Sequence, residues 1–444
     1  MSGSVVWFRR DLRVHDHPAL AAAMLEGNPR ALFVLDPVLT NGKSSSPRRN
    51  WFLLASLAEL RESLATVGVP LTVVTGNPCQ LVAGFVTFVE AQSVHVSRDY
   101  APYGRRRDAD VAATLADVGV RLVEHPGVLI TEPASITNEN GAPFTVFSAF
   151  HRRFLLHEPR PLVHAEALDT PVSEGPPVHI VHVETERPEQ APEPGERAAR
   201  GRLRKFADQR LAEYADARDD LGREGTSRLS QDLKFGLLSP VEVLAACRGS
   251  EKFVSELAWR EFAAYLLWHF PRLRHGALKS AYDHVAWRVD PAALVRWQTG
   301  TTGFGLVDAA MCQLSRTGFM PNRARMVAAS FLTKDLLIDW REGCAFFMRQ
   351  LIDGDVANNS LGWQWSASTG PDAAPYFRVM NPELQAARFD PTGSYRSAWL
   401  GTEPQPAPIV DHREARLRAI ATFQEALRTT TVGQAHPTAS GRRW

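Results

Sequence analysis

Residues 4–35 read SVVWFRRDLRVHDHPALAAAMLEGNPRALFVL, with a short apolar run at each end. The runs at 4–8 and 31–35 have the length of buried strands. Asp16 followed by Pro18 is typical of a helix start. The turn after the first run lacks the glycine fingerprint of an ordinary dinucleotide site. This stretch therefore predicts a strand–helix–strand unit without that site.

The same alternation continues through the first third of the chain. Further apolar runs lie at 71–75 and 93–97, and 51–67 has helical periodicity. We therefore expect an α/β domain over residues 1–130, with a parallel, Rossmann-like sheet. Eight prolines fall between 159 and 194, so 131–197 is predicted to be a connection. An all-α domain is expected over 198–430, with a last helix at 411–427 and a disordered tail at 431–444.

Composition excludes several classes of protein. The 50 Lys+Arg residues balance 49 Asp+Glu, so bulk charge cannot bind nucleic acid and only a local basic groove could. The four cysteines form no C-x-x-C pair, which argues against a disulfide scaffold and favours a reducing cytoplasm. No apolar run reaches the roughly 18 residues of a membrane span. A soluble, intracellular protein of two or three domains is expected.

Several polar fragments could take part in ligand binding or catalysis, although each could also have a purely structural role. Residues 225–230 (GTSRLS) follow Tyr214 and Arg218, and they offer hydroxyl and N–H groups to a phosphate. Taken alone, this fragment is more often an ordinary helix cap, because capping is so common. Glu256 and Arg260 share a helix face, where they could form a surface pair.

Two more fragments lie further along the chain. Asn322, Arg325 and Met326 are spaced to face one cavity, and Pro321 suits the first turn of their helix. Residues 353–355 (DGD) suggest a metal loop, but the calcium and zinc patterns are missing. Metal chemistry is therefore the weaker interpretation.

Together, the fragments resemble the DNA photolyase/cryptochrome family. The resembling segments are VVWFRRDLRVHDHPAL, GTSRLSQDLKFGLLS, ELAWREF, DAAMCQLSRTGFMPNRARM and LIDGDVANNSLGWQWSASTGPDAAPYFRVMNP. The resemblance points to class I photolyases and implies an α/β antenna domain and a helical domain that holds FAD. It also implies light-driven repair of cyclobutane pyrimidine dimers in DNA by a monomer, with electron transfer from excited reduced FAD to a flipped-out dimer.

The resemblance assigns roles around the FAD. Asp355 would hydrogen-bond the edge of the isoalloxazine, Arg325 and Asp353 would form an ion pair beside it, and the Asn359 amide would accept from N5–H. The implied FAD-binding residues are Tyr214, Thr226, Ser227, Arg228, Leu229, Ser230, Arg325, Asp353, Gly354, Asp355 and Asn359.

It also assigns roles around the lesion. Trp259 and Trp365 would be aromatic walls, and Glu256 would hydrogen-bond a thymine carbonyl as negative charge develops. The implied substrate contacts are Arg218, Glu256, Trp259, Arg260, Asn322, Arg323, Met326, Trp365 and Gln385. The implied catalytic residues are Glu256, Asn322, Met326 and Asn359. Phe319 and Pro321 depart from the family, where most relatives have Trp and His.

Trp287, Trp340 and Trp363 align with the family's electron-transfer chain from the surface to the flavin; core packing is the alternative explanation.

More than one interpretation is open for the identity of the antenna chromophore and for the overall activity. Relatives that bind methenyltetrahydrofolate have Glu where Gly104 stands, so the resemblance favours 8-hydroxy-5-deazaflavin, with FMN or the folate as alternatives. Asp36, Arg49, Asp99 and Lys234 are the implied antenna contacts. A cryptochrome-type blue-light receptor is the alternative activity, and the complete set of repair residues favours repair.

Overall fold

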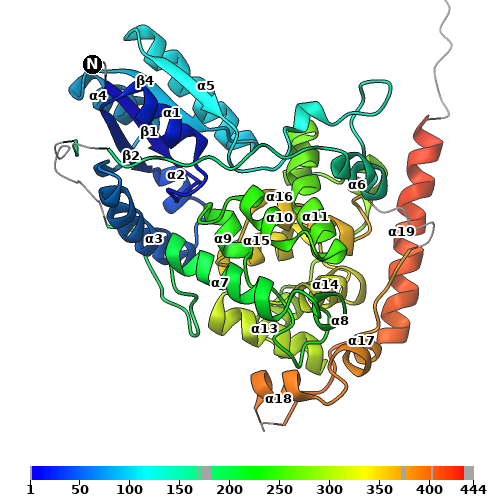
Figure 1. Ribbon diagram of the computed structural model, residues 1–444. Coiled ribbons are helices and arrows are strands. Elements are labelled where there is room, and N and C mark those ends of the chain that lie inside the picture. Colours follow the sequence, from blue (N-terminus) through cyan, green and yellow to red (C-terminus); the bar gives the residue numbers. More distant parts are fainter. Residues whose placement is uncertain (1–2, 169–170, 173–181, 372–376, 402–403, 435–444) are drawn as a thin grey trace, which may run out of the picture. The chain divides into compact units, whose positions relative to one another are not determined.

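The computed structural model describes residues 3–168, 171–172, 182–371, 377–401 and 404–434 (Figure 1). The chain forms two compact units. Unit 1 comprises Met1–Pro271, Arg316–Phe319 and Phe347–Asn358. Unit 2 comprises Arg272–Ser315, Met320–Phe346 and Asn359–Trp444. The predicted boundaries at 130, 197 and 430 stay predictions.

Unit 1 contains a parallel five-stranded sheet in the order β3-β2-β1-β4-β5. Its strands are β1 (Gly3–Phe8), β2 (Pro29–Leu35), β3 (Leu71–Thr75), β4 (Ala91–Ser97) and β5 (Arg121–His125). Each predicted apolar run forms a strand, and the α/β prediction is confirmed. The sequence did not predict β5 because this edge strand, RLVEH, is partly polar and partly exposed.

Prolines begin the five helices that accompany the sheet. These are α1 (Pro18–Glu26), α2 (Pro37–Thr40), α3 (Pro47–Thr66), α4 (Pro78–Phe88) and α5 (Pro102–Asp117). Proline fits a first helical turn because its missing N–H would have no intrahelical partner there. The side chains that cap four of these helices are those of His17, Asp36, Ser46 and Asn77.

The predicted start of α1 is right, but the capping residue is His17. Its Nδ1 accepts from the Leu20 N–H at 3.0 Å. Asp16 instead lies buried in the left-handed region, at φ 51°. Its carboxylate accepts from Arg160, at 2.8 Å for one oxygen, and from Ser239. Asp16 therefore ties the proline-rich connection to the first turn of the sheet domain.

Helices α4 and α5 pack against one face of the sheet, as one buried cluster shows. Its members are Val5, Trp7, Leu32, Val34, Val82, Phe85, Val86, Ala91, Val94, Val96, Val111 and Leu115. Because side chains alternate between the two faces of a strand, Val6 and Phe8 lie on the other face. Helix α1 contacts β1, β2 and β4, and α3 contacts β3.

Beyond the sheet, every element of the described chain is a helix, and the prediction of a helical domain in the carboxy-terminal part is confirmed. Residues 159–168, 171–172 and 182–195, within the predicted connection, form neither helix nor strand. The elements from 133 to 269 are η1 (Pro133–Ser135), α6 (Phe147–Leu155), α7 (Glu196–Gln209), α8 (Tyr214–Ala217), α9 (Ser230–Phe235), α10 (Pro240–Cys247) and α11 (Glu251–His269). Those that follow are η2 (Pro271–Arg274), η3 (Ser280–His284), α12 (Pro291–Gln298), α13 (Gly305–Thr317), α14 (Asn322–Ser330), η4 (Phe331–Asp335), α15 (Trp340–Gln350), α16 (Val356–Ser366), α17 (Pro382–Phe389), α18 (Ser394–Leu400) and α19 (His412–Gln434).

The last helix is longer than its sequence predicts. α19 runs to Gln434, so residues 431–434, which were predicted to belong to a disordered tail, are helical. Residues 435–444 of the predicted tail lie outside the described residues. Ala419 and Phe423 of α19 pack with Val285 and Leu337 in unit 2. In the described parts of the chain, no helix combines the length and the hydropathy needed to cross a membrane.

Candidate functional site

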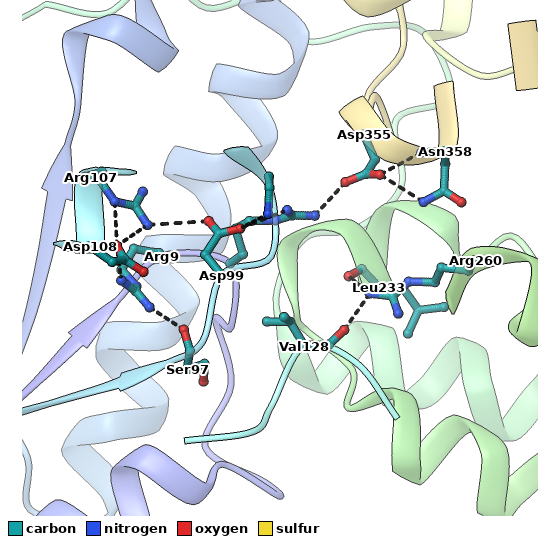
Figure 2. A network of polar contacts seen from close by, with 12 residues as sticks. Arg9, Ser97, Asp99, Arg107, Asp108, Val128, Leu233, Arg260, Asp355 and Asn358 are labelled. Atoms are coloured by element: carbon teal, nitrogen blue, oxygen red, sulfur yellow. Dashed lines mark hydrogen bonds and ion pairs between the residues drawn. The ribbon is translucent and has the colours of Figure 1, made fainter. Parts of the chain in front are cut away.

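Charged side chains gather at the carboxyl ends of β1 and β4 (Figure 2). Arg9 and Arg10 follow β1, and Asp99 follows β4. The chain reverses its direction of winding between these strands, which is where open α/β sheets bind ligands. Nη1 of Arg10 lies 3.7 Å from Oδ1 of Asp99. The predicted antenna residue Asp99 therefore lies, with Arg9 and Arg10, at the position where sheets of this topology bind ligands.

Asp108 joins two arginines of this network. Its Oδ1 lies 2.8 Å from Nη1 of Arg9 and 2.8 Å from Nη2 of Arg107. Nη2 of Arg107 is also 3.4 Å from Asp99. Burial opposes ionisation of Asp99, but the charges of Arg10 and Arg107 outweigh it and hold its pKa below the usual range. These groups are retained in the interior because each has partners of opposite charge.

Gly104 allows Asp99 to occupy this position. A Cβ atom at residue 104 would lie 2.1 Å from Oδ2 of Asp99 and 2.2 Å from its Cγ. Any larger residue would therefore displace the carboxylate. This is a physical reason for the glycine that sequence comparison marked as a departure from folate binders.

The other predicted antenna residues differ in how much they are engaged. Asp36 caps α2 through the Val38 N–H at 2.9 Å and accepts from the Tyr103 hydroxyl. Arg49 donates to the carbonyls of Ser44, Met348 and Leu351, the last at 3.2 Å. Asp36, Arg49 and Asp99 are thus already held by protein groups.

Lys234 of α9 is the predicted antenna residue with the fewest protein contacts. Its Nζ lies 4.9 Å from the centre of the Phe235 ring, and the described residues offer it no ion pair within 4 Å. Burial lowers the pKa of Lys234 to about 7, and the charges of Arg10 and Arg49 contribute. Lys234 is therefore the group best able to bind a ligand atom here.

Asp355 connects the DGD segment to this network. Its Oδ2 accepts from Arg10 at 2.6 Å. Its Oδ1 accepts from the Asn358 N–H at 3.0 Å and from Nδ2 of Asn358 at 2.9 Å. The carboxylate is thereby fixed at both oxygens just before α16. A Cβ atom at Gly354 would lie 2.7 Å from Nη1 of Arg49, so a larger residue there would require the Arg49 guanidinium to shift.

The segment predicted to bind the FAD phosphates is not an ordinary helix cap. Helix α9 begins at Ser230, and Leu229 before it makes no side-chain cap. The hydroxyls of Thr226, Ser227 and Ser230 form no hydrogen bond with any residue that the structure describes. The capping alternative is therefore not observed, and these hydroxyls are available to a ligand.

Tyr214 and Arg228 of the same predicted set are held by aromatic rings. The Tyr214 ring is buried edge-on against Phe206 and Phe253, at centroid distances of 5.6 and 5.1 Å. Arg228 has a positive φ of 58°, and its Cζ lies 3.7 Å from the centre of the Phe319 ring. Phe319, one of the departures from the family, therefore supports a predicted cofactor residue.

Glu256 and Arg260 do not pair with one another. Glu256 pairs with Arg218, and its Oε1 is 3.2 Å from Nζ of Lys252. Arg260 instead donates to Glu261 at 2.9 Å and to the Val128 carbonyl at 2.8 Å. Glu256 thus remains near the surface, whereas Arg260 is held in a buried pair, and its predicted contact with substrate stays a prediction.

Trp259, the predicted aromatic wall in unit 1, already stacks on one neighbour. The Phe147 ring lies 3.7 Å from it with an interplanar angle of 10°. Phe262 meets it edge-on at 5.9 Å. One indole face is therefore covered, which fixes the plane of the ring.

Helix α14 carries four of the predicted site residues of unit 2, namely Asn322, Arg323, Arg325 and Met326. Nδ2 of Asn322 lies 3.6 Å from Sδ of Met326, so the two share a face as predicted. Arg325 donates to the Met320 carbonyl at 2.8 Å. Arg323 lies over the Phe389 ring at 4.1 Å. Pro321 immediately precedes the helix instead of occupying its first turn.

The three tryptophans of the predicted electron-transfer chain belong to unit 2. Trp340 and Trp363 are 1% and 2% exposed, and Trp287 is half-buried against Phe423 at 5.6 Å. Trp297, which sequence reasoning left unassigned, meets Trp363 edge-on at 5.9 Å. This burial fits both core packing and electron transfer.

Asn359 is oriented by Cys344. Its Nδ2 donates to the Cys344 carbonyl at 2.9 Å and lies 3.1 Å from Sγ of the same residue. Because the amide is planar, its Oδ1 points away from Cys344 and remains an acceptor for another group. Trp365 and Gln385, also in unit 2, are half-buried.

Sequence reasoning missed Arg10 and Cys344. Arg10 could have been found from its position, because it follows β1 at the point where the sheet order reverses. Cys344 gives no such signal, since only the folded chain brings it to Asn359.

Comparison with known proteins identifies the family. Residues 4–176 match the DNA photolyase model, and residues 253–405 match the model described as the FAD binding domain of DNA photolyase. A deoxyribodipyrimidine photo-lyase of Thermus thermophilus is 41% identical over 96% of this chain and 100% of its own. A deoxyribodipyrimidine photo-lyase of Escherichia coli is 36% identical over 96% and 99%.

Solved structures agree. A bacterial class III photolyase from Agrobacterium tumefaciens superposes with a TM-score of 0.87 at 31% identity, covering 96% of this chain and 98% of its own. An archaeal photolyase from Sulfolobus tokodaii, solved with two FAD molecules, gives 0.84 at 28% identity, over 95% and 100%. A Synechocystis cryptochrome gives 0.84 at 26%, over 94% and 98%. The chain therefore belongs to the DNA photolyase/cryptochrome family.

Proposed function

We propose that this protein repairs cyclobutane pyrimidine dimers in DNA under blue light. The observation that carries the proposal is the 41% identity to a deoxyribodipyrimidine photo-lyase along that enzyme's full length. Reduced FAD, when bound, supplies the photoexcited electron that opens the cyclobutane ring, and it receives the electron back. The two carbon–carbon bonds of the ring break without net oxidation, so no further oxidant or reductant is consumed.

The residues available for FAD fit this proposal. In unit 1, the unengaged hydroxyls of Thr226 and Ser227 suit phosphate oxygens, and Asp355 presents a fixed carboxylate. In unit 2, Asn359 has its amide nitrogen held by Cys344, which leaves its oxygen to accept a proton donor such as N5–H. The predicted pairing of Arg325 with Asp353 is part of the same proposal.

The proposed contacts to the lesion also come from residues of both units. Trp259, whose plane Phe147 fixes, offers a flat apolar surface to an extruded pyrimidine pair. Glu256 can donate a hydrogen bond to a thymine carbonyl when its carboxyl group carries a proton. Arg218 lies beside it, and its positive charge stabilises negative charge that develops nearby. Asn322 and Met326, adjacent on α14, complete the proposed set of contacts to the dimer.

The antenna chromophore is proposed to be 8-hydroxy-5-deazaflavin, next to Lys234 and Asp99. FMN and methenyltetrahydrofolate are the alternatives, and the Sulfolobus tokodaii relative with two FAD molecules shows a further occupant in this family. The absorption spectrum of chromophores extracted from the purified protein would distinguish them. A cytoplasmic location is proposed, in keeping with cysteines that form no disulfide. The protein is also proposed to be a monomer.

A cryptochrome-type receptor is the second candidate, because a Synechocystis cryptochrome shares the fold with a TM-score of 0.84. The test is loss of thymine dimers from an irradiated oligonucleotide under blue light with a reductant. Repair predicts light-dependent loss and none in the dark. Tight binding of flavin without any light-dependent loss would favour the receptor.

A further inference from the structure

Arg10 lies between two carboxylates that come from distant parts of unit 1. Its Nη2 is 2.6 Å from Oδ2 of Asp355, and its Nη1 is 3.7 Å from Oδ1 of Asp99. The Arg10 side chain is 29% exposed, whereas those of Asp99 and Asp355 are 7% and 11% exposed. Both carboxylates, Asp99 and Asp355, are labelled in Figure 2. One side chain thus links the turn after β4 to the segment before α16.

Arg10 is the closest charged partner of Asp355. The other oxygen of Asp355 is occupied by the N–H and side-chain amide of Asn358, at 3.0 and 2.9 Å. The positive groups that face this carboxylate are Arg10, Lys234 and Arg260. Burial opposes ionisation of Asp355, but these charges and the Asn358 N–H hold its pKa well below the usual range.

We propose that Arg10 is a positioning residue for the flavin, acting by keeping Asp355 oriented as a hydrogen-bond acceptor at the isoalloxazine edge. The inference rests on the proposed function, in which Asp355 contacts that edge. An ionised carboxylate only accepts hydrogen bonds, whereas a protonated one also donates. Without Arg10, the buried carboxylate of Asp355 would lose its closest positive charge and would take up a proton more readily. It would then present a donor where the flavin requires an acceptor.

Arg107 provides a matched control. It is an arginine of the same network and touches the same Asp99, at 3.4 Å, together with Asp108 at 2.8 Å. Among the described residues, Arg107 forms ion pairs and hydrogen bonds with Asp99 and Asp108 but none with Asp355. Arg107→Gln therefore disturbs the network and Asp99 without removing the partner of Asp355.

The test compares the full chain with Arg10→Gln, Arg107→Gln, Asp355→Asn and the double variant Arg10→Gln/Asp355→Asn. FAD affinity is measured in the dark, and the visible spectrum of bound flavin is titrated from about pH 5 to 9, around the ordinary range of a buried carboxyl group. We expect Arg10→Gln to weaken FAD binding roughly tenfold, the effect of one charge-assisted hydrogen bond, and to make the spectrum depend on pH. Lys234, which also faces Asp355, titrates near pH 7 in every variant, so the wild type and Arg107→Gln should lack only the additional pH-dependent change that Arg10→Gln produces.

The double variant decides whether Arg10 acts through Asp355. If it does, Arg10→Gln has no further effect once Asp355 is Asn, since the two changes share one interaction. Effects that multiply independently would overturn the proposal, as would an Arg107→Gln spectrum that changes as much as that of Arg10→Gln. Should Arg10→Gln fail to fold, Arg10→Lys serves instead, because one ammonium cannot hold both carboxylates; unchanged FAD affinity in that variant would also overturn it. Failure of the wild type to bind FAD at all would contradict the proposed function instead.

Discussion

The sheet end of unit 1 and the interior of unit 2 bury their candidate side chains by different means. At the carboxyl ends of β1 and β4, Asp99 and Asp108 are buried with arginines as ion pairs. In unit 2, Trp363 is buried by Trp297 and other apolar neighbours. Paired charges hold fixed directions toward a polar ligand. Packed indoles have no such direction but can be oxidised and reduced in place. The contrast suggests binding and orientation in the first region and electron supply in the second.

In both regions, a glycine leaves the space that the functional side chain occupies. A Cβ atom at Gly104 would lie 2.1 Å from the Asp99 carboxylate. One at Gly343 of α15 would lie 2.0 Å from the Trp363 ring. The same small change, Gly to Ala, can therefore disturb either region separately.

Among these variants, Trp363→Phe should have the largest effect on photoreduction of the flavin, and it should affect electron supply alone. Phenylalanine fills most of the space but is much harder to oxidise, so we expect photoreduction of oxidised FAD to slow by more than about tenfold, which equals about 1.4 kcal/mol of barrier or more. The measurement is flavin absorption under blue light with an external reductant. Repair by chemically reduced enzyme should persist; equal loss of both activities would show that Trp363 is not the electron donor.

Lys234→Ala should affect the sheet end alone. Among the predicted antenna residues, Lys234 is the cation that is not already held by protein groups. Its loss should weaken binding of the antenna chromophore roughly tenfold, the effect of one charge-assisted hydrogen bond. FAD content should not change. Lys205→Ala, at an exposed position of α7 in the same unit, is the control. An unchanged chromophore spectrum would mean that the antenna lies elsewhere.

Gly104→Ala should destabilise unit 1 by breaking a buried ion-pair network. The Asp99 carboxylate must move away from Arg10 and Arg107, and a broken buried pair costs about 3–5 kcal/mol. Urea unfolding of the α/β region would measure this change. Gly84→Ala in α4, where an added Cβ meets no atom within 4 Å, should instead be neutral or stabilise by roughly 0.5–1 kcal/mol. Similar losses in both variants would rule out the network as the cause.

Gly343→Ala should have a smaller effect, on packing in unit 2. The methyl group would overlap the Trp363 ring, and overpacking of a core costs about 1–3 kcal/mol. Photoreduction should also slow, because the indole must shift. Gly362→Ala, one residue before Trp363 with no atom within 4 Å of the added Cβ, is the matched control. If the control slows photoreduction equally, displacement of the ring is not the reason.

Much of this organisation could be predicted from the sequence, for physical reasons that particular residues make clear. Apolar runs such as 31–35 form strands because a strand buried on both faces of a parallel sheet has little room for polar side chains. The proline starts of the helices were equally visible, as Pro18 shows. Edge strand β5 was not, because residues at an edge need not be apolar.

The candidate site could be predicted as a set of residues but not as a set of contacts. The resemblance singled out Asp99, Glu256 and Asn359, but it did not show that Arg10, Arg218 and Cys344 hold them. Those partners come from distant segments, and no periodicity or local spacing encodes such pairings. The alternatives of a helix cap at 225–230 and a pair between Glu256 and Arg260 could be rejected only once the structure showed where the hydroxyls and charges lie.

The smallest predicted effect is a pH dependence of stability that comes from Asp335. It tests how burial changes the ionisation of a carboxyl group of unit 2 that lies apart from the tryptophans. Its carboxylate lies 2.5 Å from Nδ1 of His412, and its carbonyl accepts from Arg418 of α19 at 2.7 Å. Burial raises the pKa of Asp335 to about 6, although His412 and Arg418 oppose the change. Between about pH 4 and 6, the folded chain therefore keeps a proton that the unfolded chain releases, so stability should fall as the pH rises, by at most about 1.4 kcal/mol per pH unit. Hydrogen exchange of α19 across this range would measure it. Asp335→Asn should flatten the dependence, and a stability that rises with pH over the same window would mean that the pair with His412, and not burial, governs this carboxyl group.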